Sequence, residues 1–289
     1  MLDLSHIPSQ QQQTTILYAT GDWQTWNKPR NAKFIEIFCL GGGAGGAIST
    51  VTAGSANGSV GGGSAGIVKG LIPAFLLPDT IYILVGKGGA GSTGNATNGG
   101  AGGISYIGLQ PSTSEQTLIC KSSTTTASGN RTGATTSVVS LSAFGNLGLF
   151  TAVAGVDGSV AGTSSPTQGA SQAALATNIT TGGAGGGGKT TLAFAAGGNI
   201  TSASVILTSQ VNGGVTDAQN GDSGYGTLIP FCGTGGAGGA GRQGASGAGG
   251  RGGDGWYGCG GGGVGGGTTA TGTKGGNGGD GLVIITVIC

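Results

Sequence analysis

The chain has 289 residues, of which 71 are glycine and only 7% are charged, and its formal net charge is +1. This composition excludes the highly charged, apolar-poor class of disordered chains, and without a Lys/Arg cluster it lacks the electrostatic footprint of nucleic-acid binding. No apolar run approaches the ~20 residues of a membrane span, and residues 1–13 lack the basic and apolar parts of a secretory signal, so we expect a soluble protein made in the cytoplasm.

Short strands are predicted along the whole chain after a polar, glutamine-rich arm at residues 1–14, and residues 15–289 are expected to form a single domain. The strand segments are rich in β-branched and aromatic residues and are bounded by Gly, Pro or Asn. The final segment is almost continuously apolar, which predicts a strand buried on both faces. The predicted strands are 15–20, 34–40, 67–72, 80–85, 104–107, 117–121, 137–143, 149–154, 191–195, 203–208, 227–231 and 282–288.

Glycine recurs at every third residue over 235–247, 249–261 and 272–281. A polyproline II helix has three residues per turn and no internal hydrogen bonds, so its backbone groups need partners on neighbouring segments. Collagen would need an unbroken Gly-X-Y array rich in proline, whereas this chain has 7 prolines and triplets that change phase. The pattern therefore predicts short polyglycine II helices that fold back and forth and bond side by side.

Helical signals are nearly absent, because glycine inside a helix costs about 1 kcal/mol and no stretch has the periodicity of an amphipathic helix. We expect an all-β fold: a β-sandwich of jelly-roll type, with inserted glycine-rich loops that form polyglycine II helices and almost no α-helix. Trp23 and Trp26 are predicted core residues. Function is expected on the glycine-rich loops, since loops on a rigid scaffold usually carry it.

Two glycine segments resemble nucleotide-binding motifs. Residues 183–190 match the P-loop pattern, and residues 86–91 match the dinucleotide-binding pattern. Each motif needs a following helix whose N-terminus faces the phosphates, and neither segment is followed by a helical pattern. We therefore expect no nucleotide and no other cofactor.

Catalytic side chains are scarce. The one histidine, His6, lies in the polar arm, so Ser–His or Cys–His catalysis has no base within the fold. Asp217 with Asp222, or Asp254 with Asp280, are possible carboxylate pairs, but aspartate is foremost a turn residue, and the last two are expected to bond local backbone amides. We expect a protein that is not an enzyme, with glycan hydrolysis as the alternative.

The five cysteines are Cys39, Cys120, Cys232, Cys259 and Cys289. They have no C-x-x-C spacing and are odd in number, which supports neither a zinc site nor a disulfide framework, and no metal site is expected. We interpret them as small buried side chains. A pair between Cys39 and Cys289 stays open, because both end strand-like runs.

The candidate receptor-binding residues are Trp256, Tyr257, Tyr225 and Tyr106, which interrupt the glycine-rich segments. Aromatic side chains with a polar tip are common anchors of recognition surfaces and stack on sugar rings. The alternative is that they wedge between the glycine helices and the sandwich.

Residues 26–29, 34–37 with the following Gly41–Gly43, and the terminal segment 278–285 resemble the glycine-rich, adhesin-like tail-fibre and tail-tip proteins of tailed bacteriophages. The arrangement is also similar to the glycine-rich domain of anaplastic lymphoma kinase receptors, a tumour-necrosis-factor-like sandwich with a polyglycine II bundle. The resemblance covers about residues 20–108 and 182–289. It implies a virion structural role, host recognition through loops between glycine runs, frequent trimers and no catalytic residues. The Ser/Thr-rich centre and the lack of a coiled coil favour a terminal or decorating module.

We therefore expect a bacteriophage virion protein at the tip of a tail fibre or spike. The N-terminal arm would dock on other virion proteins, the chain would form a homotrimer, and the loops would contact a host-surface glycan or protein. The alternatives are a capsid or tail decoration protein without a receptor and a glycan depolymerase.

Overall fold

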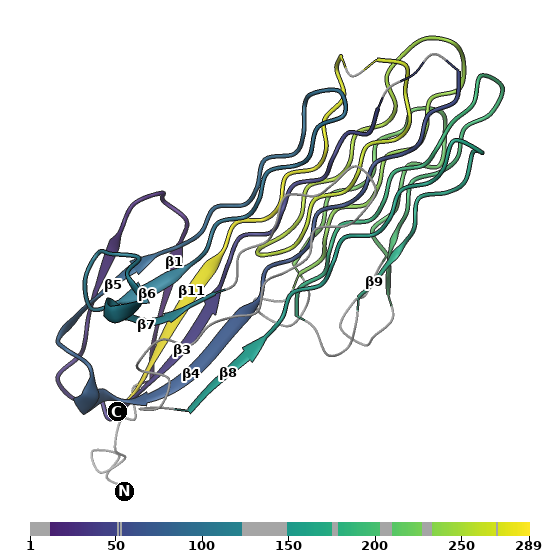
Figure 1. Cartoon of the computed structure of the whole chain (residues 1–289). Coiled ribbons are helices and arrows are strands. Elements are labelled where there is room, and N and C mark those ends of the chain that lie inside the picture. The colour runs from purple at the N-terminus through teal and green to yellow at the C-terminus, as the bar shows by residue number, and fades with distance from the viewer. Residues whose placement is uncertain are drawn as a thin grey trace, which may run out of the picture.

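Strands and glycine-rich runs form two distinct parts of the protein (Figure 1). The computed structural model describes residues 12–50, 52, 54–122, 149–174, 179–202, 210–226, 233–269 and 271–289. Two antiparallel sheets form a sandwich, and a bundle of extended runs leaves one end of it. The described helices are the short 3₁₀ segments Ala74–Leu76 and Glu115–Thr117, so the predicted all-β class is confirmed.

The larger sheet has five strands in the order β1-β11-β3-β4-β8. Its strands are β1 (Gln13–Tyr18), β11 (Leu282–Ile288), β3 (Phe34–Leu40), β4 (Ile67–Pro73) and β8 (Leu149–Val153). Strand β11 pairs with β1 on one side and β3 on the other. Its residues are buried on both faces for most of its length, which confirms the prediction from its continuous apolar sequence.

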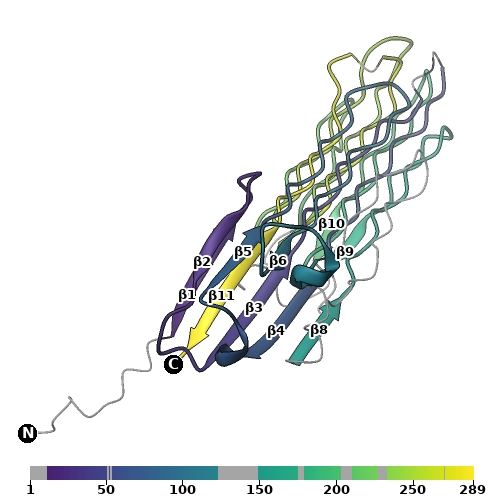
Figure 2. The same cartoon turned by 60° about the vertical axis from the view of Figure 1, so that its left-hand side comes forward.

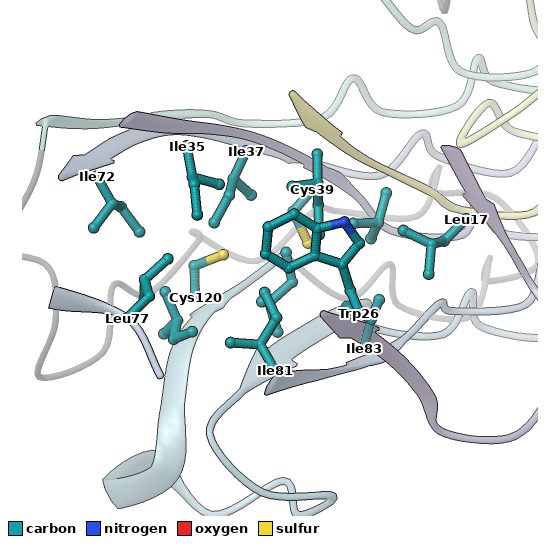
Figure 3. Close-up of a cluster of buried hydrophobic side chains, with 14 of the residues drawn as sticks. Leu17, Trp26, Ile35, Ile37, Cys39, Ile72, Leu77, Ile81, Ile83 and Cys120 are labelled. Atoms are coloured by element: carbon teal, nitrogen blue, oxygen red, sulfur yellow. The ribbon is translucent and has the colours of Figure 1, made fainter. Parts of the chain in front are cut away.

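The smaller sheet has four strands in the order β2-β5-β6-β7. They are β2 (Gln24–Asn27), β5 (Thr80–Leu84), β6 (Tyr106–Gly108) and β7 (Leu118–Lys121). Alternating side chains of the two sheets meet in one core, in which Ile35 and Ile37 lie opposite Ile81 and Ile83 (Figure 3). Trp26 is 7% exposed and belongs to this core.

Several sequence-based predictions differ from the structure. Residues 191–195 form a turn and an isolated bridge rather than a strand, because the Leu192 and Ala193 N–H groups donate to Thr190 Oγ1 within the turn. The parallel pair β9 (Gln172–Ala174) and β10 (Ile200–Ser202) was not predicted. Trp23 is half-buried, so the core prediction is wrong for it. Strand β1 includes Gln13 and Thr14, the end of the predicted arm. The predicted strands 137–143, 203–208 and 227–231 lie outside the described residues.

The cysteines are arranged differently from the pair left open by the sequence. Cys289 follows the end of β11 that pairs with Phe34, whereas Cys39 lies at the other end of β3. Cys39 instead contacts Cys120 of the facing sheet, and both are fully buried (Figure 3). This contact and burial raise the pKa of the Cys120 thiol well above its usual value. The described cysteines are free thiols, and all except half-buried Cys289 are buried, as predicted.

The turns of the glycine bundle gather at the end that lies away from the sandwich (Figure 1, Figure 2). Each described run that leaves the sandwich reverses there and returns. We call these reversals the distal turns; those described throughout are 92–97, 163–167, 190–193, 215–219 and 242–247. The sandwich and the C-terminus lie toward the opposite pole.

Some triplet glycines form turns rather than straight runs. Gly244 and Gly247 have φ angles of 102° and 117°, and Gly258 has a φ of 66°. These left-handed conformations, which glycine adopts at no steric cost, reverse the chain inside the spans 235–247 and 249–261. The first span therefore ends in the turn 242–247, and a turn at Gly258 divides the second, in keeping with the predicted short helices.

Candidate functional site

The run 259–268 is the axis of the bundle. Its backbone bonds to six surrounding runs: 41–48, 56–66, 180–189, 234–243, 248–256 and 272–281. Over three consecutive residues, Gly260, Gly261 and Gly262, the N–H groups donate to three of these runs and the carbonyls accept from the other three. The Gly261 N–H, for example, donates to Ala44 O at 2.9 Å, and Gly261 O accepts from the Gly62 N–H at 2.8 Å. One threefold turn thus serves six neighbours.

The six surrounding runs also bond to one another in a closed ring. The ring follows the order 41–48, 56–66, 180–189, 234–243, 248–256 and 272–281, and the last bonds to the first. Its successive contacts are Ala44 N–H to Gly63 O, Gly183 N–H to Gly62 O, Ala184 N–H to Gly236 O, Gly253 N–H to Ala237 O, Gly255 N–H to Asn277 O and Gly43 N–H to Gly279 O. The result is a hexagonal lattice, the side-by-side packing that the triplets predicted.

Close packing explains why the axis is almost all glycine. A Cβ atom on Gly262 would lie 2.0 Å from Ala237 O, and one on Gly265 would lie 1.8 Å from Ala240 O. Between Cys259 and Thr268 at the ends of the run, the one residue other than glycine is Val264, whose N lies 3.4 Å from Ala47 O, the longest backbone bond along this run. Glycine content is therefore a packing requirement, and it makes the lattice dense and rigid.

Aspartate and asparagine side chains replace backbone carbonyls at one edge of the lattice. Asp280 Oδ1 accepts from the Gly88 N–H at 2.7 Å, and Asp254 Oδ1 accepts from the Asn277 N–H at 2.6 Å. The two carboxylates therefore bond amides as predicted, but the prediction that these amides are local is wrong, because Gly88 and Asn277 lie on other runs of the lattice. The residues border a shallow groove of about 450 Å³.

The two nucleotide-like segments are lattice runs, and most of their amides already donate to other parts of the chain. Gly183, Gly185 and Gly187 donate to carbonyls of three other runs. In the second segment, Gly86 donates to Ser105 Oγ and Gly89 donates to Gly43 O. A phosphate cradle needs free amides that converge on one point. This geometry therefore offers no such cradle.

Lys189, the lysine of the P-loop-like segment, is fully buried. Its ammonium donates to Gly244 O at 2.8 Å and so fastens the distal turn 242–247. Burial lowers the pKa of Lys189, and the charge of Asp217 partly opposes that shift. The lysine has a structural partner where a P-loop would present it to phosphate.

Trp256 and Tyr257 lie at the turn that joins runs 248–256 and 259–268, beside the sandwich. Their rings are 5.3 Å apart at 72°, and Tyr257 is also 6.1 Å from Tyr18 of β1. Burial raises the pKa of Tyr257, with smaller contributions from Tyr18 and Asp280. Tyr257 packs on an apolar cluster that covers the outer face of the large sheet. This is the packing role that the sequence analysis gave as the alternative to receptor binding.

Trp256 is 41% exposed, and the backbone of two glycines lies against its indole. A Cβ atom on Gly233 would lie 2.5 Å from Trp256 Cδ1, and one on Gly226 would lie 3.0 Å from its Nε1. Thr234 links this ring to the next candidate, because Thr234 O accepts from the Trp256 N–H and the Thr234 N–H donates to Tyr225 O.

The structure therefore divides the four candidate receptor-binding residues. Trp256, Tyr257 and half-buried Tyr225 come together near the sandwich. Tyr106 lies on β6, where its ring is 6.4 Å from Trp23. None of the four is on a distal turn, and their role in binding stays a prediction.

The distal turns carry exposed residues that the sequence analysis did not single out. Leu192 is 83% exposed and Val215 is 63% exposed. Two shallow pockets of about 300 and 370 Å³, which share Asn57 and Ser164, adjoin the turn 163–167. These turn residues could have been found in the sequence, because Thr, Leu, Val or Gln interrupt the glycine triplets where a run ends.

Within the described ranges, no group of three or more His, Cys, Asp or Glu side chains is placed to hold a metal ion. No helix in the same part of the chain has the length and apolar character needed to cross a bilayer. No curated protein matches the sequence. The family described as glycine-rich domain matches residues 18–287, which include the smaller sheet, the lattice axis and the larger sheet apart from most of β1. The chain thus belongs to the glycine-rich domain family.

Proposed function

We propose that this protein is a structural protein of a bacteriophage virion, a tip module of a tail fibre or spike that attaches to the host surface through its distal turns. The observation that carries the proposal is that the two ends of the molecule differ. The distal turns gather at one pole, and the C-terminus and the first residues of β1 lie at the other (Figure 1). A module of this shape can be held at one end while its turns face outward.

The lattice supplies the mechanical basis of this role. Its runs bond to one another along their length, so the turns are anchored at both ends by hydrogen-bonded backbone. Turns that are ordered before contact lose less conformational entropy on binding than free loops do. In a homotrimeric tip, several weak contacts would act together and raise the overall avidity.

Attachment to the particle would belong to residues 1–14, the predicted docking arm. The last two of these residues, Gln13 and Thr14, begin strand β1. The partners there would be other virion proteins, and the protein would be located in the virion after synthesis in the host cytoplasm. A capsid or tail decoration protein without a receptor is the second candidate. A glycan depolymerase is the third.

Two measurements test the proposal together. Antibody-labelled electron microscopy of the intact particle should place the protein at the distal end of a tail structure. The purified full chain should also compete with the particle for adsorption to its host. A location in the capsid lattice, or no competition at saturating protein, would overturn the attachment function, and oligosaccharide release from envelope material would favour the depolymerase.

A further inference from the structure

The core of the sandwich holds two thiols that have no part in the lattice or in the proposed attachment. Cys39 lies on β3, at the centre of the larger sheet, and Cys120 lies on β7 of the facing sheet. Both are fully buried and belong to one apolar cluster. Their sulfur atoms are directed toward one another in the space between the sheets (Figure 3). A covalent link between them would therefore join the two sheets.

The packing around the thiols keeps them in this orientation. The Cys39 S–H donates to Ser105 O at 3.6 Å, and the Cys39 sulfur also contacts the Cys120 thiol. Burial and this contact raise the pKa of the Cys120 thiol, so the folded chain holds little of the thiolate. Because the thiolate is the form that attacks a disulfide, the closed core keeps the pair reduced.

The strand that carries Cys120 is the part of the sandwich most easily opened. Strand β7 has only four residues, lies at the edge of the smaller sheet and pairs with β6 alone, through an irregular register beside Gly108. Strand β3, by contrast, pairs with β11 on one side and β4 on the other. Short edge elements open at a lower free energy than central strands do. Opening of β7 would thus expose Cys120 while the larger sheet stays intact.

We propose that Cys39 and Cys120 are a redox-sensitive pair, which a small-molecule disulfide of the glutathione type converts to a disulfide bond between the two sheets. When β7 opens, the Cys120 thiol loses its proton, and the thiolate attacks one sulfur of the oxidant and releases its first thiol. When β7 closes, the Cys39 sulfur attacks the Cys120 sulfur and releases the second thiol. The protein gains one S–S bond, the oxidant loses one, and the protons of both cysteines end on the released thiols.

The disulfide would fasten the edge strand β7 to the centre of the larger sheet. It closes a loop of about 80 residues, and a cross-link of this span stabilises a fold mainly by restricting the unfolded chain. In a reducing compartment the pair stays as two thiols, and in an oxidising medium it forms the bond. The sandwich would therefore become more stable once the protein leaves a reducing cytoplasm.

The experiment incubates the purified full chain with reduced or with oxidised glutathione, alkylates the remaining thiols and maps the peptides by mass spectrometry. We expect oxidised glutathione to yield peptides joined through Cys39 and Cys120, together with a rise in Tm of about 8 °C that a thiol reductant reverses. Hydrogen exchange of the β7 amides should slow about tenfold or more in the oxidised chain, because the strand can no longer open alone.

Two variants serve as controls. Cys289→Ala removes a half-buried thiol outside the pair, so it should gain the same disulfide and the same rise in Tm as the wild type. Cys120→Val keeps the core filled with a side chain of similar size and removes one partner, so its Tm should not respond to oxidised glutathione. Circular dichroism shows that each variant is folded before oxidation.

Three results would overturn the proposal. The first is that Cys39 and Cys120 remain alkylated after the wild type is refolded from denaturant in oxidised glutathione, since refolding gives the oxidant full access. The second is that either thiol is linked mainly to another cysteine. The third is that the Cys39–Cys120 bond lowers Tm, or that Cys120→Val shows the same rise as the wild type, because the bond would then not fasten the sheets.

Discussion

The lattice axis gives the sharpest prediction, the substitution Gly262→Ala. The added Cβ would lie 2.0 Å from Ala237 O and 2.7 Å from the Ala237 carbonyl carbon, both backbone atoms that cannot rotate away. The run must therefore move by about 1 Å or more, and overpacking of this kind costs about 1–3 kcal/mol.

That displacement also strains two buried hydrogen bonds. The Gly262 N–H donates to Gly253 O at 2.8 Å, and Gly262 O accepts from the Gly276 N–H at 2.9 Å. A buried group left without its partner costs about 1–3 kcal/mol. With one bond lost in addition to the overpacking, we expect about 4 kcal/mol of destabilisation, which corresponds to a fall in Tm of about 8 °C for a chain of this size.

Gly94→Ala is the matched control. Gly94 lies in the distal turn 92–97, and its added Cβ would meet the rotatable side chain of Thr97 at 3.1 Å. Its effect should stay within about 1 kcal/mol, since alanine also reduces the entropy of the unfolded chain. Thermal unfolding by calorimetry measures both variants. Equal Tm values for Gly262→Ala and wild type would refute the close-packed axis.

Two further predictions concern the buried thiol and the indole. Cys120 keeps its proton when folded because its pKa is raised, whereas the unfolded thiol ionises above its ordinary pKa of 9.0, so stability falls as pH rises through that value. Between pH 9 and 10 the wild type should lose about 1 kcal/mol more than Cys120→Val in urea titrations, and parallel curves would contradict this. Trp256→Ala should cost about 2 kcal/mol, roughly half the value for a fully buried tryptophan, because Gly226 and Gly233 pack on the ring. An unchanged urea midpoint would exclude the wedge role.

Much of the sandwich follows from sequence alone. Strands β3 and β11 have the bounds that their β-branched and aromatic residues predicted, because alternation or continuity of apolar residues directly reflects how many faces are buried. The triplet period likewise predicted extended runs that bond to neighbours, since three residues per turn is a local property of the backbone. The glycine neighbours of Asp254 and Asp280 predicted that these carboxylates bond amides, but not that the amides lie on other runs.

Only the tertiary structure decided which run lies at the axis, which residues form the turns, and where the candidate site residues lie. Glycine-rich runs are nearly equivalent in local sequence, so their partners are set by the register of the whole lattice, as the contacts of Gly261 with Ala44 and Gly62 illustrate. The same register buries Lys189, places Trp256 beside the sandwich and brings Leu192 to the far pole. Composition and period determined how each run is built, whereas packing between distant runs determined what the protein presents to its surroundings.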